Sequence, residues 1–303
     1  MSEPAAIRTE NLTKFYGKNR GLLDLNLEVR PGEVFGFLGP NGAGKTTTIR
    51  LLLDLIRPTR GEARVLGINP RTSPEEVHRR TGYLPGELAL YEQLTGKEVL
   101  TFCASMRGGI DWAYVRQLCE RLDIDLSRHM SELSRGNKQK IGVLLAFFHR
   151  PELLILDEPT SSLDPLVQQE VHHLFREATE EGRTIFLSSH VLSEVERVAD
   201  RVGIIRDGTL VAVESMKTLK DRALRRVEVT FAQAVPTDSF AGLPGVRSVQ
   251  DNGTVLRLAV EGSMDALVKA LGRHEVESLT SHEADLEEIF LSYYGVTGDE
   301  DAT

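Results

Sequence analysis

The sequence predicts an α/β fold organised around a phosphate-binding loop, and three observations lead to that prediction. The apolar run 34–38 is typical of a strand, and a glycine-rich stretch and an apolar helical pattern follow it directly. A second apolar run, 153–156, is typical of a strand buried on both faces of a parallel sheet. Strand-like and helix-like segments alternate along most of the chain, as they do in α/β proteins.

The glycine-rich stretch matches the pattern G-x-x-x-x-G-K-[ST] of a phosphate-binding loop. Glycines let backbone N–H groups turn inward around an anion, and the helix beginning near Lys45 directs its positive end to the same place. We expect Lys45 to reach the terminal phosphates of a nucleotide and the Thr46 hydroxyl to bind Mg²⁺. The predicted nucleotide-binding residues of this loop are Gly39, Pro40, Asn41, Gly42, Ala43, Gly44, Lys45, Thr46 and Thr47.

Composition narrows the class of protein. The 303 residues allow one large or two modest domains, and 36 basic against 45 acidic residues argue against nucleic-acid binding through bulk charge. The longest apolar run, 141–148, falls short of the ~20 residues of a membrane span. No secretory signal precedes the first strand, so we expect a cytosolic chain. Cys103 and Cys119 lack metal-binding spacing and are expected to be buried, reduced thiols.

The first part of the chain is expected to be rich in strands. Residues 7–12 and 22–29 have strand character, the second through its alternation of apolar and polar residues. Ser73, followed by proline and completed by Glu76, predicts a capping box for a helix that ends near residue 80. A short strand is then expected at 81–84.

Between about residues 87 and 150 the pattern becomes helical. Thr95 and Glu98 form a second predicted capping box, and further helices are expected at 112–122 and 135–148. The strand 153–156 and a return to alternation follow. The remaining predicted elements here are helices 165–181 and 191–199 and strands 184–189, 202–206 and 210–213, the last two joined at Asp207-Gly208. His172 and His173 are assigned to the polar side of the first of these helices and are expected to be solvated.

The last quarter of the chain has a different character. Strand 226–231, a short helical turn, strands 246–250 and 254–260, helix 264–271 and strand 276–280 follow one another, and a closing helix is expected at 286–294. This order resembles a ferredoxin-like α+β unit. The acidic end of the chain is expected to be disordered.

Three further groups of polar residues give the phosphate loop a chemical context. Asp157 and Glu158 end the apolar strand, where open α/β sheets place ligand-binding groups. Asp157 suits the oxygen shell of Mg²⁺, and Glu158 suits the base or orienter of an attacking water. His190 follows strand 184–189 and is expected to contact the terminal phosphate. Ser134 and Gly136 open a helix and form a second candidate anion site, which suggests service to another subunit's nucleotide.

In their order and spacing, five motifs resemble those of ABC ATPases over about residues 5–220. They are the phosphate loop, the signature 133–137, the second Walker motif 153–158, the D-loop 161–164 and the switch histidine His190. Tyr16 resembles the aromatic residue that stacks on adenine. The resemblance implies a head-to-tail dimer that holds two ATP with Mg²⁺. Each site would combine the loop, Glu158 and His190 of one chain with Ser134, Gly136, Asn137 and Asp164 of its partner.

The chain departs from the family pattern in three motifs. The signature has Arg135 and Asn137 where the family usually has Gly and Gln, and the D-loop has Ser162 in place of Gly. Gly86 occupies the position of a glutamine that in the family touches Mg²⁺ and the attacking water, and Glu87 follows it. Either Glu87 or a water molecule would have to replace that glutamine.

The signature and the segment 285–291 resemble the ATPase subunits of bacterial drug and antibiotic exporters, whose permease is a separate chain. The domains implied are an ABC ATPase domain at 5–222 with a helical subdomain at about 87–150, an α+β accessory domain at 223–296 and a tail at 297–303. The expected partners are an integral-membrane permease and a second ATPase chain, identical or homologous, with no nucleic acid. The chain would be peripheral on the cytoplasmic face of the cell membrane.

Three other functions fit the sequence less well. Ribosome-acting or DNA-repair ABC ATPases are disfavoured by the single phosphate loop, the absence of coiled-coil heptads and the net charge of −9. An importer ATPase is closer, but the last quarter does not resemble an all-β regulatory domain. A binding module without turnover is disfavoured by the presence of Glu158 together with His190.

Overall fold

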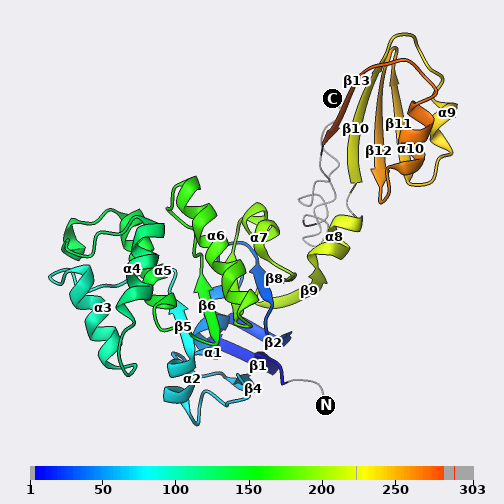
Figure 1. The fold of residues 1–303 in the computed structure, drawn as a ribbon. Coiled ribbons are helices and arrows are strands. Elements are labelled where there is room, and N and C mark those ends of the chain that lie inside the picture. Colours follow the sequence, from blue (N-terminus) through cyan, green and yellow to red (C-terminus); the bar gives the residue numbers. More distant parts are fainter. Residues whose placement is uncertain (1–3, 223, 283–289, 291–303) are drawn as a thin grey trace. The chain divides into compact units, whose positions relative to one another are not determined.

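The computed structural model describes residues 4–222, 224–282 and 290, and by its internal contacts the chain divides into two units, Met1–Val213 and Glu214–Thr303 (Figure 1). The predicted tail 297–303 lies outside the described residues, and so does the predicted closing helix except for Phe290.

Strands of the first unit are β1 (Ile7–Tyr16), β2 (Asn19–Val29), β3 (Val34–Leu38), β4 (Arg60–Val65), β5 (Thr81–Leu84), β6 (Leu153–Asp157), β7 (Thr184–Ser189) and β8 (Arg201–Arg206), and β9 (Thr209–Ser215) crosses the division. Its helices are α1 (Lys45–Leu52), α2 (Pro74–Arg80), α3 (Gly96–Ser105), α4 (Trp112–Leu122), the 3₁₀ turn η1 (Met130–Glu132), α5 (Arg135–Phe147), α6 (Pro165–Glu180) and α7 (Leu192–Val198).

Two sheets support this unit. One has six strands in the order β5-β6-β7-β3-β8-β9, and the pairs from β5 to β8 are parallel. The other is an antiparallel sheet in the order β2-β1-β4. Every residue of β3, β6 and β7 is buried, as expected for central strands of a parallel sheet. Because β3, β6 and β7 are neighbours and parallel, the loops after them meet at one edge of the sheet.

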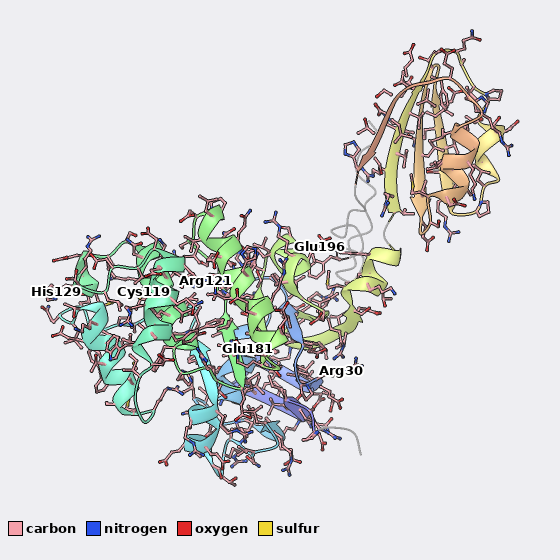
Figure 2. All side chains as sticks on the ribbon, in the orientation of Figure 1. Arg30, Cys119, Arg121, His129, Glu181 and Glu196 are labelled. Atoms are coloured by element: carbon pink, nitrogen blue, oxygen red, sulfur yellow. The ribbon has the colours of Figure 1, made fainter. Side chains whose placement is uncertain are left out.

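Helices α3, α4 and α5 gather at one end of the unit, away from β8 and β9 (Figure 1). Arg121 of α4, labelled in Figure 2, ties this end to α6. Its guanidinium pairs with the carboxylates of Glu170 and Glu177, at 2.6 and 2.8 Å for the latter. The helical segment predicted at about 87–150 is therefore linked to the sheet-bearing part by a partly buried ion-pair cluster.

Most predicted elements are present, and several sequence interpretations need correction. Cys103 and Cys119, expected to be buried, are only partly buried. Strand β4 was not predicted, because half of its residues, RGEARV, are charged. The Ser73 side chain makes no hydrogen bond to the helix it precedes, so the capping box at α2 is absent, whereas the one at Thr95 is formed. His172 is not solvated: it is 6% exposed and its ring lies 6.2 Å from that of Phe175.

The second unit contains α8 (Met216–Arg222), β10 (Leu224–Phe231), α9 (Asp238–Ala241), β11 (Val246–Asn252), β12 (Val255–Glu261), α10 (Asp265–Leu271) and β13 (Val276–His282). Its four strands form one antiparallel sheet in the order β11-β12-β10-β13. Its own apolar core includes Val227, Val229 and Phe231 of β10, together with Phe240 of α9 and Leu267 of α10. Helix α8 was not predicted from the sequence.

Candidate functional site

The loop between β3 and α1 is shaped by close backbone approaches. Gly44, the N-cap of α1, has φ 109, a conformation that other residues rarely adopt. A β-carbon there would lie 2.7 Å from the carbonyl oxygen of Gly21. A β-carbon at Gly39 would lie 2.4 Å from the carbonyl oxygen of Ile205. Only glycine therefore allows β2 and β8 to lie this close to the loop.

The turn between β8 and β9 also holds this loop. The N–H of Gly208 donates to the carbonyl of Ala43 at 2.9 Å, and the carbonyl of Gly208 accepts from the N–H of Leu23 at 2.7 Å. Ala43 is thus a backbone anchor of the loop, and its side chain is buried.

Lys45 is 6% exposed, and its ammonium group lies among oxygens. Nζ donates to the carbonyls of Gly39 at 2.6 Å and Pro40 at 3.3 Å, and lies 3.5 Å from Oε1 of Glu158. A buried ammonium needs partners of this kind, and phosphate oxygens would serve equally well. The predicted lysine therefore stands at the mouth of the loop with its charge available to an anion.

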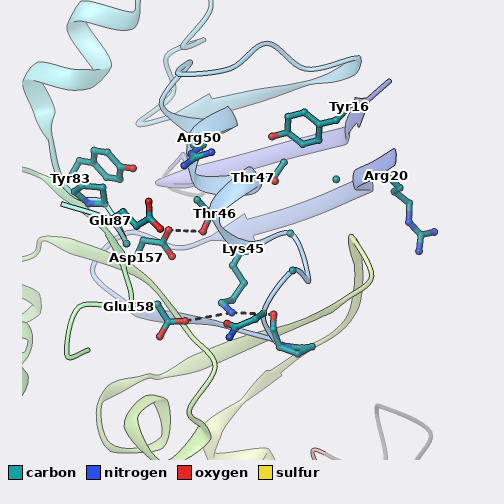
Figure 3. A pocket seen from close by; sticks show the side chains of 17 residues that line it. Tyr16, Arg20, Lys45, Thr46, Thr47, Arg50, Tyr83, Glu87, Asp157 and Glu158 are labelled. Atoms are coloured by element: carbon teal, nitrogen blue, oxygen red, sulfur yellow. Dashed lines mark hydrogen bonds and ion pairs between the residues drawn. The ribbon is translucent and has the colours of Figure 1, made fainter. Parts of the chain in front are cut away.

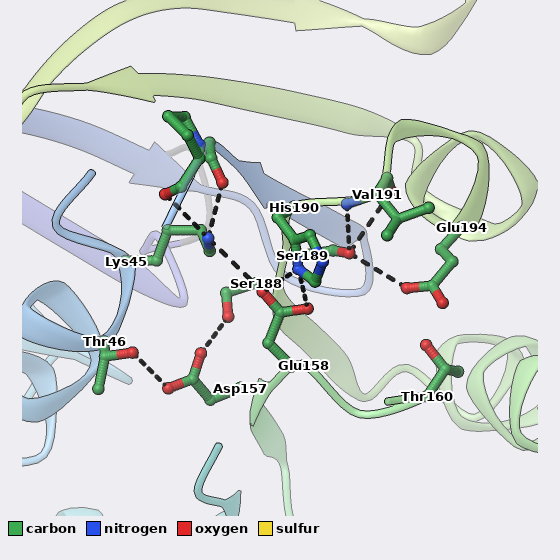
Figure 4. A network of polar contacts seen from close by, with 12 residues as sticks. Lys45, Thr46, Asp157, Glu158, Thr160, Ser188, Ser189, His190, Val191 and Glu194 are labelled. Carbon is green, nitrogen blue, oxygen red and sulfur yellow. Dashed lines mark hydrogen bonds and ion pairs between the residues drawn. The ribbon is translucent and has the colours of Figure 1, made fainter. Parts of the chain in front are cut away.

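Thr46 and Asp157 come together as predicted for a metal site. The Thr46 hydroxyl donates to Oδ2 of Asp157 at 2.7 Å, while the other carboxylate oxygen accepts from Ser188 (Figure 4). Octahedral Mg²⁺, with bonds of 2.0–2.1 Å, places neighbouring ligand oxygens about 2.9 Å apart, so this pair fits the ion. No cluster of three or more His, Cys, Asp or Glu suited to a metal occurs among the described residues.

Glu158 and His190 form the second polar pair. Nδ1 of His190 lies 2.9 Å from each carboxylate oxygen of Glu158. Glu158 has φ 52, in the left-handed region that a residue with a side chain seldom enters. Backbone strain of this kind is concentrated at functional sites. The predicted base is therefore held by His190, which the sequence predicted as a contact of the terminal phosphate and not of Glu158.

A cavity of about 570 Å³ is lined by the side chains of Lys45, Thr46, Asp157 and Glu158 (Figure 3). Of the predicted residues, the cavity is lined by Tyr16, Pro40, Asn41, Gly42, Gly44, Lys45, Thr46, Thr47, Asp157 and Glu158. Tyr16 forms one wall, with Nζ of Lys14 5.3 Å from its ring centroid. Tyr16 is 45% exposed, and a β-carbon at Gly21 would lie 2.7 Å from its ring.

Seven predicted residues are not part of this cavity wall: Gly39, Ala43, His190, Ser134, Gly136, Asn137 and Asp164. Within the chain, Ser134 accepts a hydrogen bond from the N–H of Asn137 at 3.3 Å and caps α5. Asp164 caps α6 by accepting from the N–H groups of Leu166 and Val167. A β-carbon at Gly136 would lie 2.7 Å from the carbonyl oxygen of Ser162, so the signature and the D-loop are in contact. Ser134 is exposed and open to another chain.

Gly86 and Glu87 also line the cavity. A β-carbon at Gly86 would lie 3.1 Å from Oδ2 of Asp157, so the loop backbone comes close to the predicted metal ligand. Figure 3 shows the Glu87 side chain on the Asp157 side of the cavity.

Sequence reasoning missed several residues of the site. Arg20, Gly21, Arg50, Tyr83 and Pro85 line the cavity, and Ser188 bonds Asp157. Burial and the charge of Asp157 raise the pKa of Tyr83, while Arg50 acts in the opposite direction. Ser188 pairs with Asp157 in the β6–β7 register, so it would have been found had the strand order been known.

Within the described ranges, none of the helices has the length and apolar character that crossing a bilayer requires.

Comparison with known proteins agrees with this geometry. The family model described as ABC transporter matches residues 22–161. The bacitracin transport ATP-binding protein of Bacillus licheniformis is 40% identical over 225 residues, which cover 73% of this chain and 74% of that protein. The daunorubicin/doxorubicin resistance ATP-binding protein of Streptomyces peucetius is 33% identical and covers 98% of this chain and 95% of its own length.

A solved structure, described as the ATP-binding subunit of an ABC transporter, superposes with a TM-score of 0.66 at 32% identity. It covers 71% of this chain and 92% of its own.

Proposed function

The chain belongs to the ATP-binding proteins of the ABC transporter family, and from that premise we propose that it is the ATP-hydrolysing subunit of an exporter. One observation carries the proposal. The phosphate loop with Lys45, the Thr46–Asp157 pair and the carboxylate of Glu158, which His190 contacts from behind the cavity wall, converge on a single cavity. Side chains that bind phosphate, bind a hard cation and accept a proton are the parts that phosphoryl transfer to water needs.

The proposed chemistry follows from these positions. The loop amides and Lys45 hold the β- and γ-phosphates of ATP. Glu158 accepts a proton from the water that attacks the γ-phosphorus in line, the β–γ bond breaks, and ADP and phosphate result. His190, 2.9 Å from both Glu158 oxygens, orients that carboxylate. Mg²⁺, held by Thr46 and Asp157, would neutralise the charge of the β- and γ-phosphates.

A second ATPase chain, identical or homologous, is proposed to complete each site. Ser134 is exposed and stands at the N-terminus of α5, whose amides favour an anion, yet it does not line the cavity of its own chain. A head-to-tail partner would bring its Ser134, Gly136, Asn137 and Asp164 to the ATP held by Lys45. Binding of two ATP would then close the dimer, and hydrolysis would reopen it.

A membrane permease is the proposed third component, and it would hold the chain at the cytoplasmic face of the membrane. Tyr91, Phe102 and Met106 expose 67, 49 and 65% of their surfaces in the helical segment. The rings of Tyr91 and Phe102 meet edge to face at 6.3 Å. Exposed aromatic and methionine side chains that lie together are typical of a protein contact.

The substrate class and the second unit belong to the same proposal. The similarity to proteins named for bacitracin transport and daunorubicin/doxorubicin resistance favours efflux of drugs, antibiotics or lipid-like compounds.

We assign residues 223–296 to a ferredoxin-like accessory domain that follows the ATPase domain 5–222. The element order β-α-β-β-α-β and the sheet order β11-β12-β10-β13 support this assignment.

The test is co-expression with the membrane protein encoded beside this gene. We expect the two to co-purify from detergent, and vesicles containing both to export an antibiotic in an ATP-dependent manner. Tyr91→Asp should abolish co-purification while the free chain still binds ATP, because Tyr91 does not line the cavity. Purification with ribosomes instead of a membrane protein would contradict the proposal.

A further inference from the structure

The Gln139 side chain joins helix α5 to the backbone that carries Glu158. Gln139 is 8% exposed, and its Nε2 lies 3.1 Å from the carbonyl oxygen of Glu158 and 3.1 Å from that of Pro159. A primary amide has two N–H donors, so one side chain can satisfy both carbonyls. Gln139 therefore binds the main chain at two consecutive peptide groups.

Glu158 requires support of this kind. Its φ of 52 places it in the left-handed region, which is unfavourable for a residue with a β-carbon. Such a conformation persists only where the surroundings determine it. The carboxylate is held by His190 at one end, and the backbone is held by Gln139 at the other.

We propose that Gln139 is a positioning residue for hydrolysis, which keeps the Glu158 backbone in the conformation that directs its carboxylate toward the nucleotide. The inference rests on the proposed function, because it takes Glu158 as the base. Without the amide, the carbonyl of Pro159 loses this donor, and the carbonyl of Glu158 keeps the N–H of Ser161 at 3.2 Å. The backbone can then relax toward negative φ, which turns the side chain away. A displacement of about 1 Å at a reacting group can cost ~10²-fold in rate.

The position of Gln139 in its helix adds a second consequence. Helix α5 begins after Ser134, the residue proposed to face the partner's ATP, and Gln139 lies five residues further along. The same helix thus contacts both candidate nucleotide sites of the dimer, one through its N-terminus and one through Gln139. A shift of α5 on closure would be transmitted to Glu158 of the same chain.

The test is the variant Gln139→Met in the full-length chain, since methionine keeps the length of the side chain and removes both donors. We expect kcat of the folded protein to fall about tenfold or more, while the ATP dissociation constant stays within about twofold, because Gln139 does not line the cavity. In a Glu158→Gln background, Gln139→Met should cause no further loss, because a residue acting through Glu158 cannot act once that carboxylate is gone.

Gln168 offers a matched control. Its Nε2 also donates to two carbonyls of the same loop, those of Thr160 at 3.3 Å and Leu163 at 3.1 Å. Gln168→Met removes an equivalent amide and should lower Tm by a similar amount, but kcat should change by no more than about twofold. If Gln139→Met does not fold, Gln139→Asn replaces it, since the shorter amide cannot reach both carbonyls and should show the same loss of kcat.

The outcomes separate the inference from the proposed function. Equal kcat losses in the Gln139 and Gln168 variants would overturn the positioning role, as would an undiminished effect of Gln139→Met in the Glu158→Gln background. Full turnover by Glu158→Gln itself would instead overturn the role of Glu158 on which the proposed function depends.

Discussion

At the scale of single residues, Glu158 combines an unfavourable backbone angle with a fixed carboxylate. Its φ of 52 and its contacts with His190 and Lys45 are features that a sequence does not display. The prediction that it acts as a base came from its place directly after Asp157 at the end of a buried strand. The fold shows how its side chain is held.

Glu158→Gln keeps the shape of the side chain and removes its ability to accept a proton. We expect hydrolysis to fall ~10²-fold or more, as the loss of a positioned general base implies, while ATP binding persists. The variant should accumulate as an ATP-bound dimer, measurable by size-exclusion chromatography with light scattering. Normal turnover in that variant would show that another group takes the proton.

The backbone of Ser162 is strained. Its φ of 65 is left-handed, at the position where the related motif has glycine. Relief of about 1–2 kcal/mol of strain exceeds the ~0.5–1 kcal/mol entropic cost of glycine, so Ser162→Gly should raise Tm by about 1–3 °C.

Ser161→Gly is the control for this measurement. Ser161 is not among the residues with positive φ, so glycine there should only add chain entropy to the unfolded state and lower Tm. Equal shifts for both variants in thermal unfolding would contradict the strain at Ser162.

At the scale of elements, the two predicted capping boxes had different outcomes although their sequence patterns agree. Thr95 has extended backbone and exchanges hydrogen bonds with Glu98. Ser73 has φ −141 and ψ 58, and its N–H donates to the carbonyl of Asn69, so the chain enters α2 from a turn that directs the hydroxyl elsewhere. A local pattern predicts the helix, but the approach of the chain decides whether the cap forms.

Strand β4 forms although its local sequence does not predict a strand. Its residues Arg60–Val65 have little strand propensity, and they form a strand because β1 offers an antiparallel partner, with Ile7 opposite Val65. Tertiary context of this kind cannot be found in a window of six residues.

The end of α5 carries a group that should make stability depend on pH. Burial, reinforced by the charge of Arg107, lowers the pKa of His149 to about 4, and its Nε2 accepts from that guanidinium at 2.8 Å. Above pH 6.5, the usual histidine pKa, His149 is neutral in both the unfolded and the folded chain. Its contribution to the free energy of unfolding is then fully present. Between pH 6.5 and 4 only the unfolded chain binds the proton, so stability falls as pH falls, by on the order of 3 kcal/mol.

Urea unfolding of the wild type and of His149→Gln between pH 7.5 and 4.5 measures this contribution. The variant should be less stable at pH 7.5, yet its stability should fall less steeply with acid. Parallel pH profiles for the two proteins would show that His149 takes no part.

At the scale of the whole molecule, the order of elements was largely predictable, and their arrangement in space was not. Parallel strands β3, β6 and β7 are separated by long segments in the sequence, and their adjacency comes only from the fold. This explains why Lys45, Asp157 and Glu158 could be predicted from motifs, while Ser188 and Gln139 could not. Their roles depend on register and on one helix lying against the loop after β6.

Mixing two inactive variants tests the composite site. Lys45→Ala should abolish ATP binding in its own loop, and Ser134→Glu should repel the phosphates of the partner's ATP. Neither variant alone should hydrolyse ATP. A mixture forms hybrid dimers in which one site has both an intact Lys45 and an intact Ser134, so ATPase activity should reappear.

Two results would contradict a site composed of residues from two chains. A Ser134→Glu chain that hydrolyses ATP at the wild-type rate as a monomer would mean that one chain carries the complete site. A mixture that stays inactive, although hybrid dimers are detected by crosslinking, would mean that Ser134 does not face the partner's nucleotide.

Gly208 has a consequence for how ATP energy is used. Its N–H and carbonyl connect Ala43 of the phosphate loop to Leu23 of β2 before any ligand arrives. A phosphate loop that is already ordered loses little conformational entropy when it binds ATP. More of the affinity for ATP then remains to draw two chains together, and this is the work that an exporter needs from its nucleotide.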